Sequence, residues 1–121
     1  MAFAYSPLLD AAAEIITTIA TSAGAVYTNP AATTSYVRCI TIHNTYTSAE
    51  AVSLYLVPDN AGAVGTAGNA NKFFYESVPA NDTRIIEFPA PGLMLVDEND
   101  TIQASTTTAS RVTISITGAT E

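Results

Sequence analysis

Tryptophan is absent from the sequence, and cysteine and histidine occur once each in 121 residues. The lone Cys39 excludes a disulfide within the chain, and its place in a strand-like run predicts a small packed side chain rather than a reactive thiol. A metal site built on His43 would need carboxylates as its other ligands, and the sequence supplies none at a fixed spacing. A polar strand end is therefore the preferred interpretation of His43, and we predict neither a metal nor a cofactor.

Positive charge is also scarce, since four cations stand against eleven acids and give a net charge of −7. The cations are Arg38, Lys72, Arg84 and Arg111. Their scatter argues against binding to a phosphate backbone, which requires clustered lysine and arginine. No basic segment precedes an apolar run at the N-terminus, and no run approaches the ~20 apolar residues of a spanning helix. We predict a chain that is made in the cytosol and stays soluble, and that binds neither nucleic acid nor membrane.

Catalytic motifs are missing as well. The sequence contains no Gly-x-Ser-x-Gly turn around a nucleophile and no glycine loop of the kind that cradles phosphate. The acidic run at residues 97–100 offers oxygens that Ca²⁺ prefers, but it is shorter than an EF-hand loop and lacks the spaced ligands of one. A solvated turn is the preferred interpretation of this run, and we predict that the protein is not an enzyme.

Alanine and threonine dominate what is present, and hydrophobic residues make up 48% of the chain against 12% charged residues. This balance is too apolar and too weakly charged for a disordered chain. Threonine-rich strands expose hydroxyl and methyl groups, and such surfaces lose little solvation free energy when another subunit covers them. The composition is therefore consistent with a protein that assembles with other subunits.

The best-specified stretch of the sequence is residues 35–58, where two strand-like runs flank a polar turn. Residues 36–43 are rich in β-branched and aromatic side chains, and residues 50–57 alternate aliphatic side chains with polar or aromatic ones. A period of two places alternate side chains on opposite faces of a sheet. We predict a hairpin with a longer loop, whose second strand ends at Pro58 because proline cannot donate to the ladder.

Further strand-like runs, separated by Gly, Pro, Asn and Asp, continue through the chain. They occupy residues 14–21, 25–28, 72–78, 83–88, 93–96, 101–105 and 111–117. Gly118 is expected to end the last of them. Eight or nine short strands at regular spacing predict an all-β protein, an antiparallel two-layer β-sandwich of the jelly-roll or immunoglobulin-like kind. We predict that the sandwich spans residues 14–121 and that residues 1–13 form a short N-terminal arm.

The predicted arm is apolar and is unfavourable to leave in water. Its large apolar side chains are Phe3, Tyr5, Leu8 and Leu9. Ser6 and Pro7 would suit the N-cap and the first position of a short helix, and an extended arm is the alternative. In either form the arm contacts another subunit or covers one end of its own sandwich. The sequence leaves these alternatives open.

Two other segments raise the question of binding. Residues 59–71 are rich in glycine and asparagine and predict a long, mobile surface loop, which is either a plain connection or a binding loop. Phe73, Phe74 and Tyr75 occupy one predicted strand, and aromatics on both faces of a strand favour a half-core, half-interface role over a sugar-stacking platform. The residues predicted to contact partners are Phe3, Tyr5, Leu8, Leu9, Phe73 and Tyr75.

Five blocks of the sequence share an order and spacing with a known class of proteins. The blocks are AVYTNPA at residues 25–31, YVRCITIHNT at 36–45, VSLYLVP at 52–58, PANDT at 79–83 and LVDENDTIQA at 95–104. Their succession resembles small structural virion proteins of tailed bacteriophages, over residues 15–118. Asn99 departs from the glycine of that pattern, although asparagine tolerates the same left-handed geometry.

The resemblance implies a β-sandwich building block of a phage particle. The leading hypothesis is a capsid decoration (cement) protein on the virion surface, a homotrimer that binds the outside of the major capsid protein and stabilises the shell. Residues 1–13 would then reach the capsid protein or a neighbouring copy. The alternative is a tail, neck or fibre subunit that recognises a host-surface glycan through residues 59–71 and 73–75.

Overall fold

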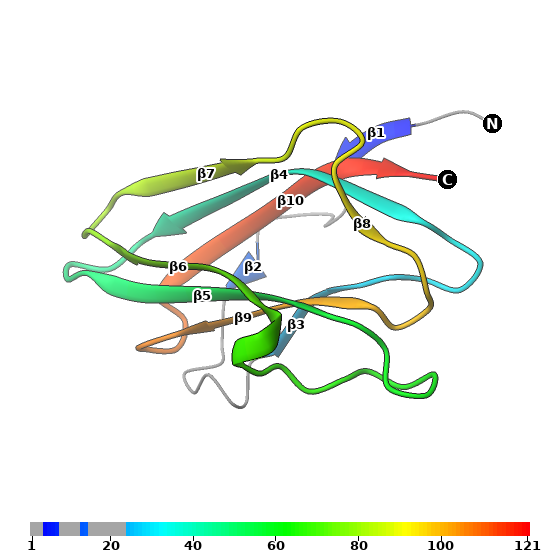
Figure 1. The fold of residues 1–121 in the computed structure, drawn as a ribbon. Helices are drawn as coiled ribbons and strands as arrows, with labels where there is room; N and C mark the ends of the chain where they lie inside the picture. The colour runs from blue at the N-terminus through cyan, green and yellow to red at the C-terminus, as the bar shows by residue number, and fades with distance from the viewer. Residues whose placement is uncertain (1–3, 8–12, 15–23) are drawn as a thin grey trace.

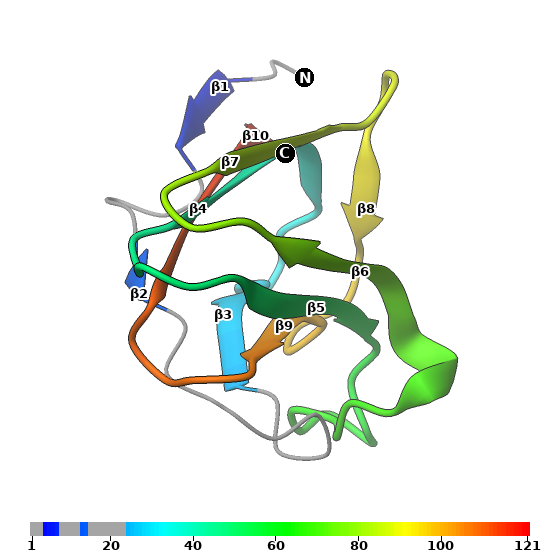
Figure 2. The ribbon, with the colours of Figure 1, turned by 90° about the vertical axis from the view of Figure 1, so that its left-hand side faces the viewer.

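Two antiparallel β-sheets packed face to face form the protein, as the computed structural model shows for residues 4–7, 13–14 and 24–121 (Figure 1). Figure 2 shows the sheets as two layers. This arrangement confirms the prediction of an all-β, two-layer sandwich. Within the described ranges the helical structure amounts to one 3₁₀ turn, η2 (Asn69–Asn71), and no helix there has the length and apolarity to cross a bilayer.

Sheet A, the six-stranded sheet, is built around β4 (Ser35–Asn44) and β10 (Val112–Thr120). These strands are antiparallel, with Ile42 opposite Ile114 and Ile40 opposite Ile116. Four shorter strands flank them: β1 (Ala4–Pro7) and β2 (Ala13–Glu14) pair with β10, and β7 (Thr83–Glu87) and β8 (Leu93–Leu95) pair with β4.

Sheet B has four strands, in the order β3 (Gly24–Thr28), β9 (Thr101–Thr106), β5 (Glu50–Val57) and β6 (Lys72–Val78). From β3 onward, the chain changes sheet at every step except from β5 to β6 and from β7 to β8. This succession is that of a jelly roll, and it selects one of the two sandwich types expected from the sequence.

β4 and β5 do not form the hairpin predicted for residues 35–58, because they lie in different sheets. The buried side chain of Asn44 holds the crossing between them. Its amide nitrogen donates to Ser48 O at 2.9 Å and to Val78 O at 3.0 Å, and its oxygen accepts from Tyr46 N at 2.9 Å. The hairpin prediction was wrong because a period of two identifies a strand but fits a partner in either sheet.

The core fills the space between the sheets with aliphatic side chains from both. Sheet A contributes Val37, Ile40, Ile42, Leu95, Val112, Ile114 and Ile116, and sheet B contributes Val52, Leu54, Val78, Ile102 and Ala104. The inward alternation predicted at the C-terminal strand is confirmed. Burying a large aliphatic side chain contributes roughly 1.5–3 kcal/mol, so this cluster is the main force that holds the layers together.

β10 does not end at Gly118, as the sequence had suggested, but continues to Thr120. Its register against β4 shifts between Thr117 and Gly118. A Cβ at position 118 would lie 1.9 Å from Tyr36 O. Glycine is therefore required here by the close approach of the β4 backbone, which is the other common reason for glycine in a strand.

Residues 4–7 are extended and pair with the end of β10, with Tyr5 opposite Ala119. The short helix suggested by Ser6 and Pro7 is therefore wrong at these positions, and the extended alternative holds there. β2 adds a second short contact, with Glu14 opposite Thr113. Residues 1–3 and 8–12 of the predicted arm, and residues 15–21 of the strand predicted at 14–21, lie outside the described residues.

Candidate functional site

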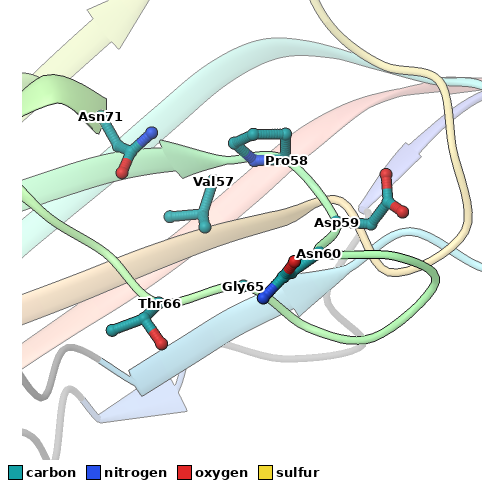
Figure 3. A pocket seen from close by; sticks show the side chains of 7 residues that line it. All are labelled: Val57, Pro58, Asp59, Asn60, Gly65, Thr66 and Asn71. Carbon is teal, nitrogen blue, oxygen red and sulfur yellow. The ribbon is translucent and has the colours of Figure 1, made fainter.

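Two surface regions are candidates for binding: a pocket beside sheet B and the outer face of sheet A. The pocket has a volume of about 300 Å³ and lies where the loop of residues 59–71 leaves β5 (Figure 3). It is lined by Val57, Pro58, Asp59, Asn60, Gly65, Thr66 and Asn71. Amide, hydroxyl and carboxylate groups around an apolar floor suit a small polar ligand.

The loop of residues 59–71 lies against the outer face of sheet B. Ala67 is 6% exposed and forms a small apolar cluster with Tyr55 and Val57, whose side chains point away from the main core. An outer face that carries a tyrosine and a valine gains free energy when the chain covers it. The surface loop predicted at residues 59–71 is found, and at Ala67 it is packed against the sheet.

Gly65 brings the loop backbone close to the end of β5. A Cβ at this position would lie 2.6 Å from Pro58 O, so a larger residue would push the loop away. The buried Gln103 of β9 also fixes the loop at Gly65, because its amide nitrogen donates to Gly65 O at 3.0 Å. The pocket is thus built by a loop that is fixed to the sheet rather than by a free one.

Three carboxylates meet beside the pocket, where oxygens of Asp59, Asp97 and Asp100 lie within 4.8 Å of one another. Asp100 accepts from Asp59 N through Oδ1 and from Asp97 N through Oδ2, both at 2.9 Å. Asp59 Oδ2 accepts from Gly62 N at 2.9 Å. Although Ca²⁺ prefers carboxylate oxygens, these ones already fix two turns, which is the role predicted for residues 97–100.

Asn29, buried just after β3, positions the acidic turn. Its amide nitrogen donates to Asp97 O at 3.0 Å and Thr33 O at 2.7 Å, and its oxygen accepts from Ser35 Oγ at 2.6 Å. The backbone of Asn99 completes the contact by donating to Asn29 O at 3.0 Å. Asn99 has a φ of 70°, so the left-handed geometry expected at this position is confirmed.

The second region is the part of the outer face of sheet A that three rows of paired residues form across β10, β4 and β7; this part is called the outer face of sheet A below. The rows are Thr113–His43–Thr83, Ser115–Thr41–Ile85 and Thr117–Cys39–Glu87. They contain one carboxylate, one imidazole and no lysine or arginine, and Ile85 is 62% exposed. The hydroxyl-and-methyl surface expected from the composition is found on this face, where it costs little to desolvate.

Cys39 and His43 both belong to this face. Cys39 is half-buried, with Sγ 3.9 Å from Thr41 Oγ1, so the small packed side chain predicted here is packed only in part, and it points away from the core. His43 lies near the end of β4, and its Nδ1 is 2.7 Å from Thr83 Oγ1. The polar strand end predicted for His43 is confirmed.

The six residues predicted to contact partners fall into different environments. Phe3, Leu8 and Leu9 lie outside the described residues, and Tyr5 is part of β1 in sheet A. Phe73 is half-buried and packs edge-on against Phe88, with ring centroids 6.1 Å apart.

Tyr75 is 64% exposed, and Lys72 Nζ lies 5.4 Å from its ring centroid. Phe73 is thus partly committed to packing, whereas Tyr75 is available to a partner on the ring surface that Lys72 leaves uncovered. The half-core part of the prediction is confirmed, because Phe73 and Phe74 pack against the core. The interface role of the exposed Tyr75 stays a prediction.

Arg84 joins the two sheets at the margin where β6 and β7 lie. Its Nε lies 2.5 Å from Glu76 Oε1, and its Nη1 lies 2.5 Å from Asp82 Oδ2. Hydrogen bonds to Glu76 and Asp82 raise the pKa of Arg84, and the guanidinium holds the pKa of Asp82 below its ordinary value. All three side chains are accessible to solvent, so salt screens this ion pair and its net contribution is small.

Sequence reasoning missed the pocket and the meeting of Asp59 with the acidic turn. Both depend on the pairing of β5 with β9, which places Val57 opposite Thr101. Each segment carries an ordinary turn signal, Pro-Asp-Asn after β5 and Asp-Glu-Asn-Asp before β9. Nothing local to either signal shows that they adjoin, so a knowledge of strand order was needed to find the site.

The fold and these two regions define a jelly-roll β-sandwich with a small polar pocket and, on sheet A, three outer rows that hold no lysine or arginine. No model of a known protein family matches the sequence, no curated protein matches it, and the comparison with solved structures finds no match either. A function is therefore argued from the surfaces of this molecule.

Proposed function

We propose that this chain is a structural protein of a tailed-phage particle, and specifically a decoration protein that binds the outside of the capsid and stabilises the shell. The observation that carries the proposal is the outer face of sheet A, whose three rows hold one carboxylate, one imidazole and no lysine or arginine. A partner covers such a face at little cost in desolvation. The sequence blocks that resemble virion proteins support the same class, and the jelly roll, which viral capsid domains use, supports it by analogy.

In this role, the outer face of sheet A is the surface that meets the major capsid protein, and copies of the chain associate into a symmetric oligomer. A stable contact of this kind buries roughly 1,200–2,000 Å² in total. Within the predicted arm, residues 4–7 pair with β10 of their own chain and extend sheet A. The net charge of −7 keeps a densely displayed surface soluble.

Cryo-electron microscopy of the particle that carries this chain tests the proposal. We expect density repeated over the capsid lattice, and density confined to the tail or neck would overturn the decoration role. A matched pair of variants assigns the contact face: Thr41→Arg, at the centre of the outer face of sheet A, lowers occupancy on the shell. Thr28→Arg, an exposed threonine at the end of β3 in sheet B, leaves occupancy unchanged.

A glycan-binding tail or fibre subunit is the second candidate, favoured by the polar pocket and by the exposed ring of Tyr75. Sugars bind through hydrogen bonds to amide and carboxylate groups and through stacking on aromatic rings. Binding on a glycan array that is abolished by Asn60→Ala or Tyr75→Ala supports this role. Absence of binding by the wild-type chain, with lattice-wide density on the capsid, removes it.

A further inference from the structure

β7 is an edge strand of sheet A, and the outward side of its backbone is not paired with another described strand. Four strands with described side chains lie at the edges of the sheets: β7 and β8 in sheet A, and β3 and β6 in sheet B. β8 has three residues, and a very short edge strand offers little to pair with. The registers of β3 and β6 against their neighbours are both interrupted by bulges, whereas β7 pairs with β4 without a break from Thr83 to Glu87. β7 contains no bulge, lysine or proline, and its two charged residues are Arg84 and Glu87. Charged side chains also protect edges, but the charge of Arg84 is already paired with Glu76 and Asp82.

The hydrogen bonds between β7 and β4 determine which backbone N–H and C=O groups of β7 face away from β4. Asn44 N donates to Asp82 O and Phe88 N donates to Arg38 O, both at 2.9 Å, which marks these as hydrogen-bonded pairs. Hydrogen-bonded and non-hydrogen-bonded pairs alternate along an antiparallel ladder. Ile85 and Glu87 therefore belong to non-hydrogen-bonded pairs, and their N–H and C=O groups point away from β4.

At Ile85 and Glu87, the outward N–H and C=O groups have no hydrogen-bond partner among the described residues. The backbone N–H and C=O of Thr83 also point away from β4, but both have partners. The N–H donates to Asp82 Oδ1 at 2.8 Å, and the carbonyl accepts from Arg84 Nη1 at 3.3 Å. The centre of the open edge is thus Ile85, which combines a free backbone edge with a side chain that is 62% exposed. Figure 1 shows β7 along one margin of sheet A.

We propose that β7 pairs antiparallel with β7 of a second copy of this chain, about a two-fold axis at Ile85. In this register Ile85 lies opposite its own copy and exchanges two backbone hydrogen bonds with it. Thr83 of each chain lies opposite Glu87 of the other, so no like charges face each other. Arg84 does not oppose the approach, because it points to the inner side and is already paired with Glu76 and Asp82. The two sheets A then join into one continuous sheet.

Charge selects this register over the next one that the backbone allows. An axis at Ile86 would place Glu87 opposite the second chain's Ile85 and would bring the two Glu87 carboxylates to a diagonal separation of roughly 7–8 Å. With the axis at Ile85, the two glutamates lie at opposite ends of the paired segment. The isologous pairing closes at two chains, so it is independent of the proposed capsid role and of any three-fold contact through another surface.

Cysteine cross-linking in the Cys39→Ser background tests the register. Opposite residues in a hydrogen-bonded pair have Cα atoms about 5.5 Å apart, within the roughly 4.4–6.8 Å range of disulfides. We expect Ile85→Cys to oxidise to a covalent dimer. Thr83→Cys is the matched control, because its two copies would be offset by four residues and about 14 Å apart, so it stays monomeric.

Failure of Ile85→Cys to cross-link, with a circular dichroism spectrum like that of the wild type, would overturn the proposal. Equal cross-linking of both variants would show random collision and would overturn it as well.

Light scattering provides a second readout on the full chain. We expect wild-type protein to reach twice its 12.6 kDa mass as concentration rises. Ile85→Lys should abolish this rise by placing two cations opposite each other, whereas Ser115→Lys, on the same face but two strands from the edge, preserves it. A wild-type chain that stays monomeric, or one in which Ile85→Lys changes nothing, contradicts the pairing.

Discussion

The outer faces of the two sheets differ in how much of their side chains is exposed to water. On sheet B, Tyr55 and Val57 are 1% and 2% exposed because the chain's own loop covers them. On sheet A the corresponding central strand presents Cys39, Thr41 and His43, and the edge residue Ile85 is 62% exposed. The same alternation of side chains builds both strands, so the difference lies in what occupies the outward positions.

This contrast shows how one sandwich separates a face that supports its own fold from a face that is open to other molecules. Apolar outward residues on β5 require cover, and residues 59–71 supply it. Hydroxyl-bearing outward residues on β4 tolerate water and lose little when a partner displaces it. We therefore expect substitutions on sheet B to affect stability and substitutions on sheet A to affect association.

The largest expected effect comes from Tyr55→Ala, which removes the biggest fully buried side chain and the surface on which Ala67 rests. We expect the free energy of unfolding to fall by about 3–5 kcal/mol, as for other buried aromatics. Ile85→Thr, which keeps a β-branched residue on the exposed face, should change it by less than about 0.5 kcal/mol. Urea unfolding at dilutions where the chain is monomeric measures both. Equal losses would show that the two faces do not differ as described.

Two glycines in the covering loop sharpen the comparison. Gly65→Ala should cost roughly 1–3 kcal/mol, because its Cβ would meet Pro58 O at 2.6 Å and lift the loop from sheet B. Gly68→Ala is the matched control, since the nearest atom to its Cβ, Asn71 Oδ1, is 4.0 Å away. Thermal melting should show a drop of several degrees for the first variant and little change for the second. Faster amide exchange in residues 59–71 of Gly65→Ala alone would locate the effect in the loop.

The smallest expected effect concerns Asp82, at the margin between the two sheets. Arg84 lowers the pKa of Asp82 from its ordinary value of 3.8, so the ionised carboxyl stabilises the fold above that pH. This stabilisation is lost as the pH falls through the lower folded-state pKa. The wild type should therefore be more stable than Asp82→Asn at neutral pH, and the difference should vanish in strong acid and shrink in high salt.

Glu98→Gln, an exposed acid in the turn before β9, controls for the change in net charge. A pH-independent difference between the wild type and Asp82→Asn would mean that the ion pair is not its source. Urea midpoints measured from neutral pH to below the folded-state pKa of Asp82 decide between these outcomes.

Local chemistry made much of the fold predictable. The strand predicted at residues 72–78 coincides with β6, and Pro58 follows the last residue of β5. The alternation of Val112, Ile114 and Ile116 pointed to the core, and Asn99 adopts the left-handed conformation that its turn demanded. Each of these features depends on residues that are close together in the sequence.

Features that depend on strand order were not predictable. The hairpin expected at residues 35–58 is a crossing between sheets, because the partners of β4 are β7, β8 and β10 rather than β5. The cover over Tyr55 and the meeting of Asp59 with Asp100 likewise follow from the pairing of β5 with β9. Sequence could describe each strand but not its neighbours, since the hydrophobic pattern of a strand is the same beside any of them.

The central pair of sheet A also sets the order in which the chain can be completed. β4 is made early, whereas its partner β10 is the last strand, with Val112 opposite Asn44 and Thr120 opposite Ser35. Contacts of such long sequence separation form slowly, and a ribosome-bound chain cannot form them until β10 has emerged. During synthesis the ten-residue β4 therefore lacks its longest partner, which makes it the segment most in need of protection from aggregation before the sandwich closes.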